Sequence, residues 1–245
     1  MVSEGPRVAN PVPVIEVKSL SKRFGQTVAL TNINLEIYQG DAMVIGGPNG
    51  SGKSTLLKIL CGIIRHPRAA RVSVLGLDPW PNRHLIFRRI AASFEDYSFP
   101  DVVTGKQYLE FVAGIRGVDK DTMHDSVANL FGLESFWERP TRGYSSGMKR
   151  KVALAQLFVK AGEIILLDEP FIALDRATKL QLIEKLKEQR ANGVTLVMST
   201  HLMTDLEELV SSLIVLVNGE LHKNIPMSIE SAGLEEQYRS ALGSA

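Results

Sequence analysis

One run of nine residues, Gly47 to Thr55, has the residue types and spacing that bind phosphate. It reads Gly-Pro-Asn-Gly-Ser-Gly-Lys-Ser-Thr and fits the motif G-x-x-x-x-G-K-[ST]. The glycines let the backbone turn sharply and point several N–H groups inward, and a helix that begins here adds the positive end of its dipole. The run therefore predicts a socket for the phosphates of a nucleoside triphosphate.

The side chains that end this loop have separate expected tasks. Lys53 is placed to reach the β- and γ-phosphates, Ser54 to give its hydroxyl to Mg²⁺, and Thr55 to hydrogen-bond nearby phosphate oxygens. The alternative is a glycine-rich turn with a chance lysine, which the flanking strand and helix patterns disfavour. The residues expected to bind nucleotide in this loop are Gly47, Asn49, Gly50, Ser51, Gly52, Lys53, Ser54 and Thr55.

Two carboxylates, Asp168 and Glu169, directly follow the apolar run 164–167. Such a run is typical of a buried strand, and an open α/β sheet binds its ligands at the carboxyl ends of strands. Asp168 is expected to hold Mg²⁺ directly or through water. Glu169 is expected to act as the general base that polarises a water for in-line attack on the γ-phosphate. Alone the pair could be a helix cap; together with Lys53 it favours hydrolysis.

The flanking sequence supplies the elements that must hold these groups. Apolar residues over 42–45 predict a buried strand before the loop, and those over 56–60 begin a helix after it. Alternation over 15–17 and 33–37 predicts half-buried antiparallel strands. We therefore expect an α/β fold: a phosphate-loop NTPase core with a mixed, mainly parallel sheet and an N-terminal antiparallel β region.

Helical periodicity replaces strand patterns from about Ser93 to Gly162, which predicts an all-helical insertion with apolar faces over 108–112, 127–131 and 152–159. Strand and helix then alternate again: helix 176–192, strand 194–199, a helix near Met203, and a hairpin turning at Asn218-Gly219. The expected organisation is a mobile N-terminal arm over 1–13, an ATP-binding core over 14–92 and 163–225, a helical subdomain over 93–162, and a C-terminal tail over 226–245 with a short helix.

Composition excludes several classes of function. The chain has 245 residues, 44% of them hydrophobic, and a formal net charge of +1 with no long block of one sign, so no nucleic acid is expected among its partners. Cys61 is the single cysteine and is expected to be a small buried side chain, with a reactive thiol as the alternative. Because no run of about 18 apolar residues occurs, the chain is not expected to cross a membrane.

A second segment carries a resemblance to a known family. Tyr144-Ser145-Ser146-Gly147-Met148, followed by the basic residues 149–151 and an apolar helical pattern, is similar to the signature Leu-Ser-Gly-Gly-Gln of the nucleotide-binding domain of ABC-type ATPases. The resemblance covers nearly everything from Val14 to about Ile225. It implies that Ser145 and Gly147 contact the γ-phosphate bound to a second subunit. Ser146 departs from the family pattern by placing a side chain where the family usually has none.

The signature segment also has a physical reading of its own. Ser145 can cap a helix that starts near Gly147, which creates another anion-binding helix N-terminus. The alternative is a plain capped helix with a solvated basic face at 149–151.

Four further positions gain an expected role from the resemblance. Ala173-Leu174-Asp175 looks like the loop that crosses the dimer interface, although Asp175 alone reads equally as a helix N-cap. His201, just past a buried strand, resembles the histidine that touches the γ-phosphate, and Phe24 resembles the aromatic residue that stacks on adenine. Where the family usually has a glutamine that senses Mg²⁺ and water, this chain has Glu95, a further candidate metal ligand.

The resemblance implies an ATPase that binds ATP and Mg²⁺ and dimerises on ATP, with a second copy of itself or a homologous subunit. It would drive a separate transmembrane permease, in an exporter-type branch, from the cytoplasmic face of the cell membrane. The competing reading is a non-transport ABC ATPase, for example of the iron–sulfur assembly type. A GTPase is disfavoured because the chain contains no Asn-Lys-x-Asp motif, which reads guanine. A small-molecule kinase is disfavoured because the helical insertion with its signature resembles ABC ATPases more closely.

Overall fold

The structure is a computed structural model that describes residues 12–96, 98–160, 162–201, 203–227 and 233–243. The expected N-terminal arm over 1–13 lies outside the described residues except for Val12 and Pro13.

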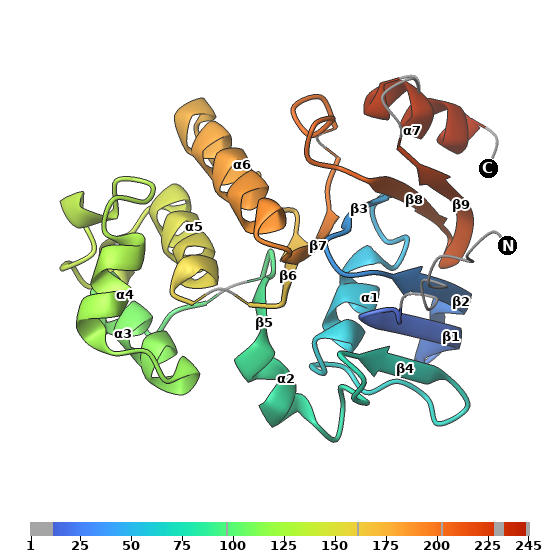
Figure 1. Ribbon diagram of the computed structural model, residues 1–245, viewed down its shortest axis with the longest axis horizontal. Coiled ribbons are helices and arrows are strands. Elements are labelled where there is room, and N and C mark those ends of the chain that lie inside the picture. The colour runs from blue at the N-terminus through green and yellow to red at the C-terminus, as the bar shows by residue number, and fades with distance from the viewer. Residues whose placement is uncertain (1–11, 97, 161, 202, 228–232, 244–245) are drawn as a thin grey trace, which may run out of the picture.

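A six-stranded sheet with the order β5-β6-β7-β3-β8-β9 forms the centre of the molecule (Figure 1). Every pair in it is parallel except β8 and β9, which are antiparallel and joined by the expected turn, with Asn218 and Gly219 both at positive φ. The mixed, mainly parallel sheet expected from the sequence is confirmed. Its strands are β3 (Ala42–Gly46), β5 (Ile90–Ser93), β6 (Ile164–Asp168), β7 (Thr195–Ser199), β8 (Ser212–Val217) and β9 (Glu220–Pro226).

A second, antiparallel sheet comprises β1 (Ile15–Phe24), β2 (Thr27–Ile37) and β4 (Arg71–Val74) in the order β2-β1-β4. Alternate residues such as Ile15, Val17 and Ile37 are buried, because one face of the sheet packs on the core while the other meets solvent. The helix α1 (Lys53–Leu60) lies between the two sheets, and its buried leucines and isoleucine belong to the same apolar cluster as residues of both.

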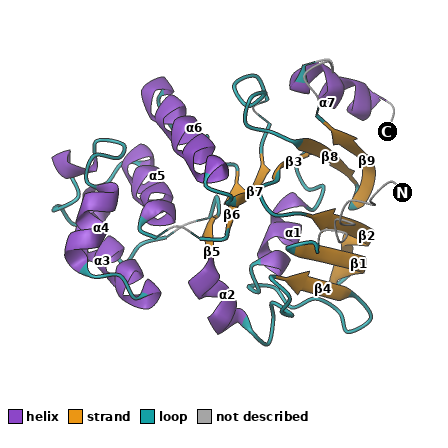
Figure 2. Ribbon diagram, in the orientation of Figure 1, coloured by secondary structure: helices purple, strands orange, loops and turns teal. Residues whose placement is uncertain are grey.

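The helical insertion lies on the far side of the central sheet from the antiparallel sheet (Figure 2). Its α-helices are α3 (Gly105–Arg116), α4 (Lys120–Val127) and α5 (Ser146–Ala155). Two expected helices are shorter than the apolar pattern suggested. Phe131 has a left-handed φ of 56°, which ends helical geometry beyond α4, and α5 passes into a 3-10 turn over Gln156–Phe158. Phe111 was expected on the buried face of α3, but it is 66% exposed.

Other elements depart from the sequence prediction in the core. The expected helix near Met203 is wrong: residues 203–210 form turns. The strand β5 was not predicted, since its small residues at 91–93 carry little strand signal. His66 is buried, and its ring nitrogens lie within hydrogen-bond distance of Pro67 and Asp78. The remaining α-helices are α2 (Arg83–Arg89), α6 (Arg176–Ala191) and α7 (Leu234–Gly243), the last of which lies in the expected C-terminal tail.

The structure also bears on the single cysteine and on the possibility of a membrane span. Cys61 is 2% exposed, and burial raises the pKa of its thiol to about 12, so the buried, unreactive reading holds. Within the described residues, no helix is both long and apolar enough to span a membrane.

Candidate functional site

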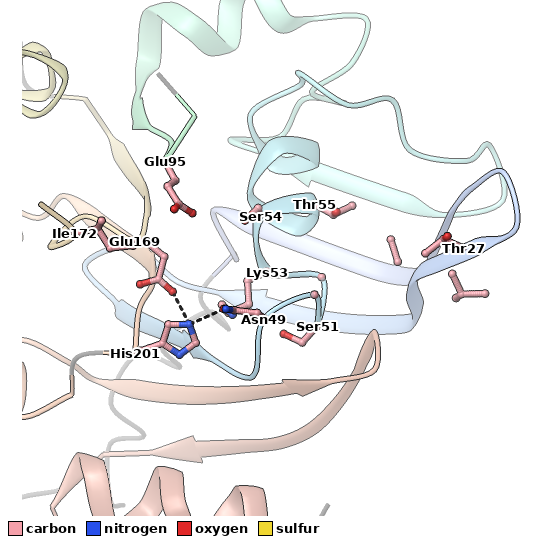
Figure 3. A pocket seen from close by; sticks show the side chains of 14 residues that line it. Thr27, Asn49, Ser51, Lys53, Ser54, Thr55, Glu95, Glu169, Ile172 and His201 are labelled. Atoms are coloured by element: carbon pink, nitrogen blue, oxygen red, sulfur yellow. Dashed lines mark hydrogen bonds and ion pairs between the residues drawn. The ribbon is translucent and has the colours of Figure 1, made fainter. Parts of the chain in front are cut away.

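A cavity of about 460 Å³ opens at the carboxyl ends of the central strands (Figure 3). The phosphate loop and the start of α1 form one wall, the start of β2 another, and Glu95, Glu169, Ile172 and His201 the third. The residues that line the cavity come from segments far apart in the sequence, the first being Thr27 and the last His201. Such a gathering is expected at the strand ends of an α/β sheet.

Two glycines in the loop are required by close backbone packing. Gly47 has φ 145° and a Cβ there would meet the carbonyl oxygen of Leu216 at 2.1 Å; Gly52 has φ 105° and a Cβ would meet that of Ala29 at 2.4 Å. Gly52 also precedes α1 without a side-chain cap, so the first N–H groups of the helix are available to an anion. The loop is therefore built as a socket for phosphate.

Lys53 lies at the base of this socket. It is 6% exposed, and its Nζ donates to the carbonyl oxygens of Gly47 at 2.8 Å and Pro48 at 3.1 Å. Burial lowers the pKa of Lys53, while the nearby Glu169 and Asp168 act in the opposite direction. The two carbonyls hold the ammonium group across the loop, where phosphate oxygens would compete for its protons.

Glu169 occupies an unusual backbone position just after β6. Its φ is 44°, and its N–H donates to Ser199 at the end of β7, to the carbonyl at 3.0 Å and the hydroxyl at 3.1 Å. Its Oε1 lies 3.1 Å from Nε2 of His201. Burial raises the pKa of Glu169, and the charges of His201 and Lys53 partly oppose this. A raised pKa suits a carboxylate that must accept a proton near neutral pH.

His201 joins the two halves of the cavity. The same Nε2 that faces Glu169 lies 3.2 Å from Oδ1 of Asn49 in the phosphate loop (Figure 3). Its side chain is 45% exposed, so a ligand in the cavity has access to it.

Asp168 is buried and does not line the cavity. It is 2% exposed and accepts a hydrogen bond of 2.5 Å from the Ser199 hydroxyl, whereas Ser54 and Glu95 line the cavity. Among the described residues, no group of three or more His, Cys, Asp or Glu could hold a metal. This donor set still fits Mg²⁺, which keeps several waters and takes only one or two carboxylates together with substrate phosphates.

Ser145 and Gly147 lie away from this cavity. Ser145 is the N-cap of α5, and its hydroxyl accepts from the N–H of Met148 at 3.2 Å. Gly147 packs against the carbonyl of Ala173, which a Cβ would meet at 3.2 Å. Neither lines the cavity, and α5 and α1 lie on opposite sides of β6 (Figure 1). The second anion-binding helix N-terminus therefore does not face the cavity of its own chain.

Asp175 is the N-cap of α6 and also joins two helices. Its carboxylate accepts from the N–H of Thr178 at 2.8 Å and lies 3.1 Å from Nζ of Lys151 on α5. Hydrogen bonds from Thr178, and then from Lys151, lower the pKa of Asp175 to about 2. The helix-cap reading therefore holds within one chain, and the interface role stays a prediction.

The structure also adds contacts that the sequence did not predict. Thr27, Val28 and Ala29 line the cavity because β2 begins beside the loop, and Tyr238 of α7 accepts from the N–H of Gly47 at 3.2 Å. None of these has a local sequence signal. Phe24, the expected adenine contact, does not line the cavity, but it is 47% exposed at the end of β1 beside it.

Comparisons with known proteins show which family has a similar sequence. A family model described as ABC transporter matches residues 30–172. The chain is 34% identical over 211 residues to "Probable sulfate/thiosulfate import ATP-binding protein CysA" of Chlorella vulgaris, covering 84% of this chain and 89% of that protein. It is 29% identical to the bacitracin transport ATP-binding protein BcrA of Bacillus licheniformis, covering 87% and 70%.

Solved structures agree with the sequence relatives. An ATP-binding subunit of an ABC transporter superposes with a TM-score of 0.85 at 25% identity, over 94% of this chain and 99% of that one. A bacterial ABC transporter cassette solved as a dimer gives a TM-score of 0.77 at 24% identity, over 87% and 99%, and so supports the fold.

Proposed function

The chain belongs to the ABC transporter family of ATP-binding subunits, which are ATPases, and from this we propose that it is the dimeric ATP-driven motor of a separate membrane permease. One observation carries the proposal. The cavity holds a phosphate loop, Glu169 and His201, but the capped helix N-terminus at Ser145 faces elsewhere.

A second copy would complete the site. In a two-fold dimer the same surface meets itself, so α5 of each copy would lie over the cavity of the other. The N-terminus of α5 would then face the γ-phosphate, an anion that a helix N-terminus stabilises. A bacterial ABC transporter cassette of the same fold was solved as a dimer, which supports dimerisation of this chain.

The residues of the chain suit hydrolysis of ATP by in-line attack of water. The loop N–H groups and Lys53 would bind the phosphates, and Glu169 would take the proton of the attacking water at its carboxylate. His201 would orient Glu169 and contact the γ-phosphate from the other side. Mg²⁺ would neutralise charge on the phosphates, with Ser54 and Asp168 holding it directly or through water and Glu95 as a further carboxylate.

Replacing Ser145 with arginine tests the completed site. We expect each monomer to bind ATP with unchanged affinity, while ATP turnover falls on the order of 10²-fold, as for loss of a group that stabilises transition-state charge. Light scattering after size exclusion should show the ATP-bound dimer for the parent and a monomer for the variant. The matched control is Ser126→Arg, an equal change at an exposed serine of α4.

The concentration dependence of the parent provides a second check. If two copies build each site, ATP turnover per molecule rises with protein concentration until dimerisation is complete. Constant turnover per molecule from a protein that stays monomeric with ATP would contradict a shared site.

Replacing Glu95 with glutamine tests the metal assignment. Glu95 lines the cavity, and loss of its charge is expected to raise the Mg²⁺ concentration for half-maximal turnover by about tenfold, the scale for a residue that supports a metal. A Mg²⁺ titration at saturating ATP measures it. Asp96→Asn is the control, because Asp96 is the next carboxylate and pairs with Lys58 at 2.8 Å. Identical titration curves would remove Glu95 from metal binding.

The permease is proposed from the family and from exposed apolar side chains. Phe111 and Ile115 lie one turn apart on α3 and are 66% and 50% exposed, which suits contact with a protein partner. We place the chain on the cytoplasmic face of the membrane through that partner, and we favour export, as the bacitracin-transport relative suggests. Import is the second candidate because the relative CysA is named for import.

Membrane vesicles that contain the chain and its permease decide the direction. Export predicts ATP-dependent accumulation of substrate in inside-out vesicles, whereas import predicts ATP-dependent loss from them. ATPase activity that no membrane protein stimulates or binds would favour a non-transport role.

A further inference from the structure

Arg150 lies in the second turn of α5 and is 1% exposed. It belongs to a basic triplet, 149–151, whose sequence suggests a solvated face, but its guanidinium points into the protein. Its Nη2 donates to the carbonyl oxygens of Asp168 at 3.1 Å and Glu169 at 2.6 Å, and its Nε to that of Pro170 at 3.3 Å. Its Nη1 donates to the carbonyl of Phe94 at 3.0 Å.

Such a contact requires arginine. Burying a cation costs several kcal/mol, so it persists only where good hydrogen bonds compensate it. The guanidinium offers five donors in a fixed planar fork, whereas lysine offers a point charge with three. Here the fork meets three consecutive carbonyls that begin at the last residue of β6 and one carbonyl after β5, which ties the helical insertion to both strand ends.

The backbone segments that Arg150 holds carry residues whose position matters for the proposed reaction. Glu169 has a left-handed φ of 44°, a conformation that is unfavourable for a non-glycine residue. Its N–H is fixed by Ser199 and its carbonyl by Arg150, so the strained peptide is held from both sides. Phe94 immediately precedes Glu95, whose side chain lines the cavity.

We propose that Arg150 is a positioning residue for ATP hydrolysis, which holds the backbone of Asp168, Glu169 and Phe94 so that the Glu169 carboxylate faces His201. This rests on the proposed function. Because Arg150 and Ser145 share α5, the helix end that would serve the partner's nucleotide is tied to the base that serves the chain's own. Arg150 therefore links the two sites of one dimer.

Arg150→Gln removes most of the fork, and Arg150→Lys keeps the charge. For Arg150→Gln we expect a 10- to 100-fold fall in kcat with the ATP dissociation constant unchanged within threefold, because the phosphate loop is untouched. Arg150→Lys should recover little of kcat, since lysine cannot reach all four carbonyls.

Arg116→Gln is the matched control. Arg116 of α3 is also partly buried and donates to the carbonyls of Gln156, Lys160 and Ile90, so it ties the same insertion to the other end of β5, away from the cavity. A loss of stability in this variant without a change in kcat separates positioning from general tethering.

Hydrogen exchange tests the proposal independently of turnover. Residues 93–96 and 168–171 should exchange faster in Arg150→Gln than in the parent, while α1 keeps its protection. Exchange that is unchanged in both segments, or a kcat equal to that of the parent, would overturn the positioning role. A parent protein that does not hydrolyse ATP would instead overturn the proposed function and leave the exchange result to judge Arg150.

Discussion

Glu169→Gln is expected to lower ATP turnover by roughly 10²- to 10⁴-fold while ATP binding is retained. Glutamine keeps the size and the contact distance to His201 but cannot accept a proton from the attacking water. With hydrolysis blocked, the ATP-bound dimer should accumulate. Steady-state phosphate release and light scattering with ATP measure the two effects. Unchanged turnover would remove Glu169 from the role of general base.

The pH dependence of turnover in the parent protein is a second test of Glu169 as the general base. Burial raises the pKa of Glu169, so its carboxylate protonates at a higher pH than an ordinary glutamate, and turnover should fall as the pH falls through that raised value. The residual activity of Glu169→Gln should lack this acid limb.

Stability provides the folding control for the glutamine variant. Because folding raises the pKa of Glu169, the protonated form favours the folded state, and this contribution is lost as the pH rises through the raised pKa. Glutamine does not ionise, so the variant should melt no lower than the parent at neutral pH. Glu163→Gln, an exposed carboxylate paired with Arg89 before β6, is the matched control and should leave turnover unchanged.

Lys53→Ala should lower the affinity for ATP by roughly 10²-fold or more, because it removes charge-assisted hydrogen bonds of about 1.5–3 kcal/mol each to the phosphates. The variant loses the hydrogen bonds from Lys53 to the carbonyls of Gly47 and Pro48, but it keeps the close backbone packing of Gly47 on Leu216 and of Gly52 on Ala29. Isothermal calorimetry with ATP and Mg²⁺ measures the loss.

A lysine of the same helix is the control for this change. Lys58, in the last turn of α1, pairs with Asp96 instead of facing the loop, so Lys58→Ala should bind ATP like the parent. Tight ATP binding by Lys53→Ala would contradict the phosphate-loop assignment.

Features set by contiguous residues could be predicted from the sequence. The phosphate loop is one such feature, because its glycines, lysine and following helix lie within one short segment. The strands β3, β6 and β7 were predicted from mainly apolar runs, which are typical of strands buried on both faces. The turn at Asn218-Gly219 followed from residues that accept positive φ.

Features set by packing could not be predicted in this way. Phe111 and Arg150 have the residue types of a core face and a solvated face, yet the first is exposed and the second buried, because the neighbours of α3 and α5 decide which side is covered. The apolar residues near Met203 fill the core from turns instead of from a helix.

The sequence by itself determined that the chain has two segments suited to anions, the loop from Gly47 to Thr55 and the helix that begins after Ser145. Only the tertiary structure decided that Glu169 and His201 lie 3.1 Å apart in the cavity beside the first segment, while α5 is held away from it. The physical reason is that a motif fixes local hydrogen-bonding groups, whereas the sheet order and the buried Arg150 fix where those groups face.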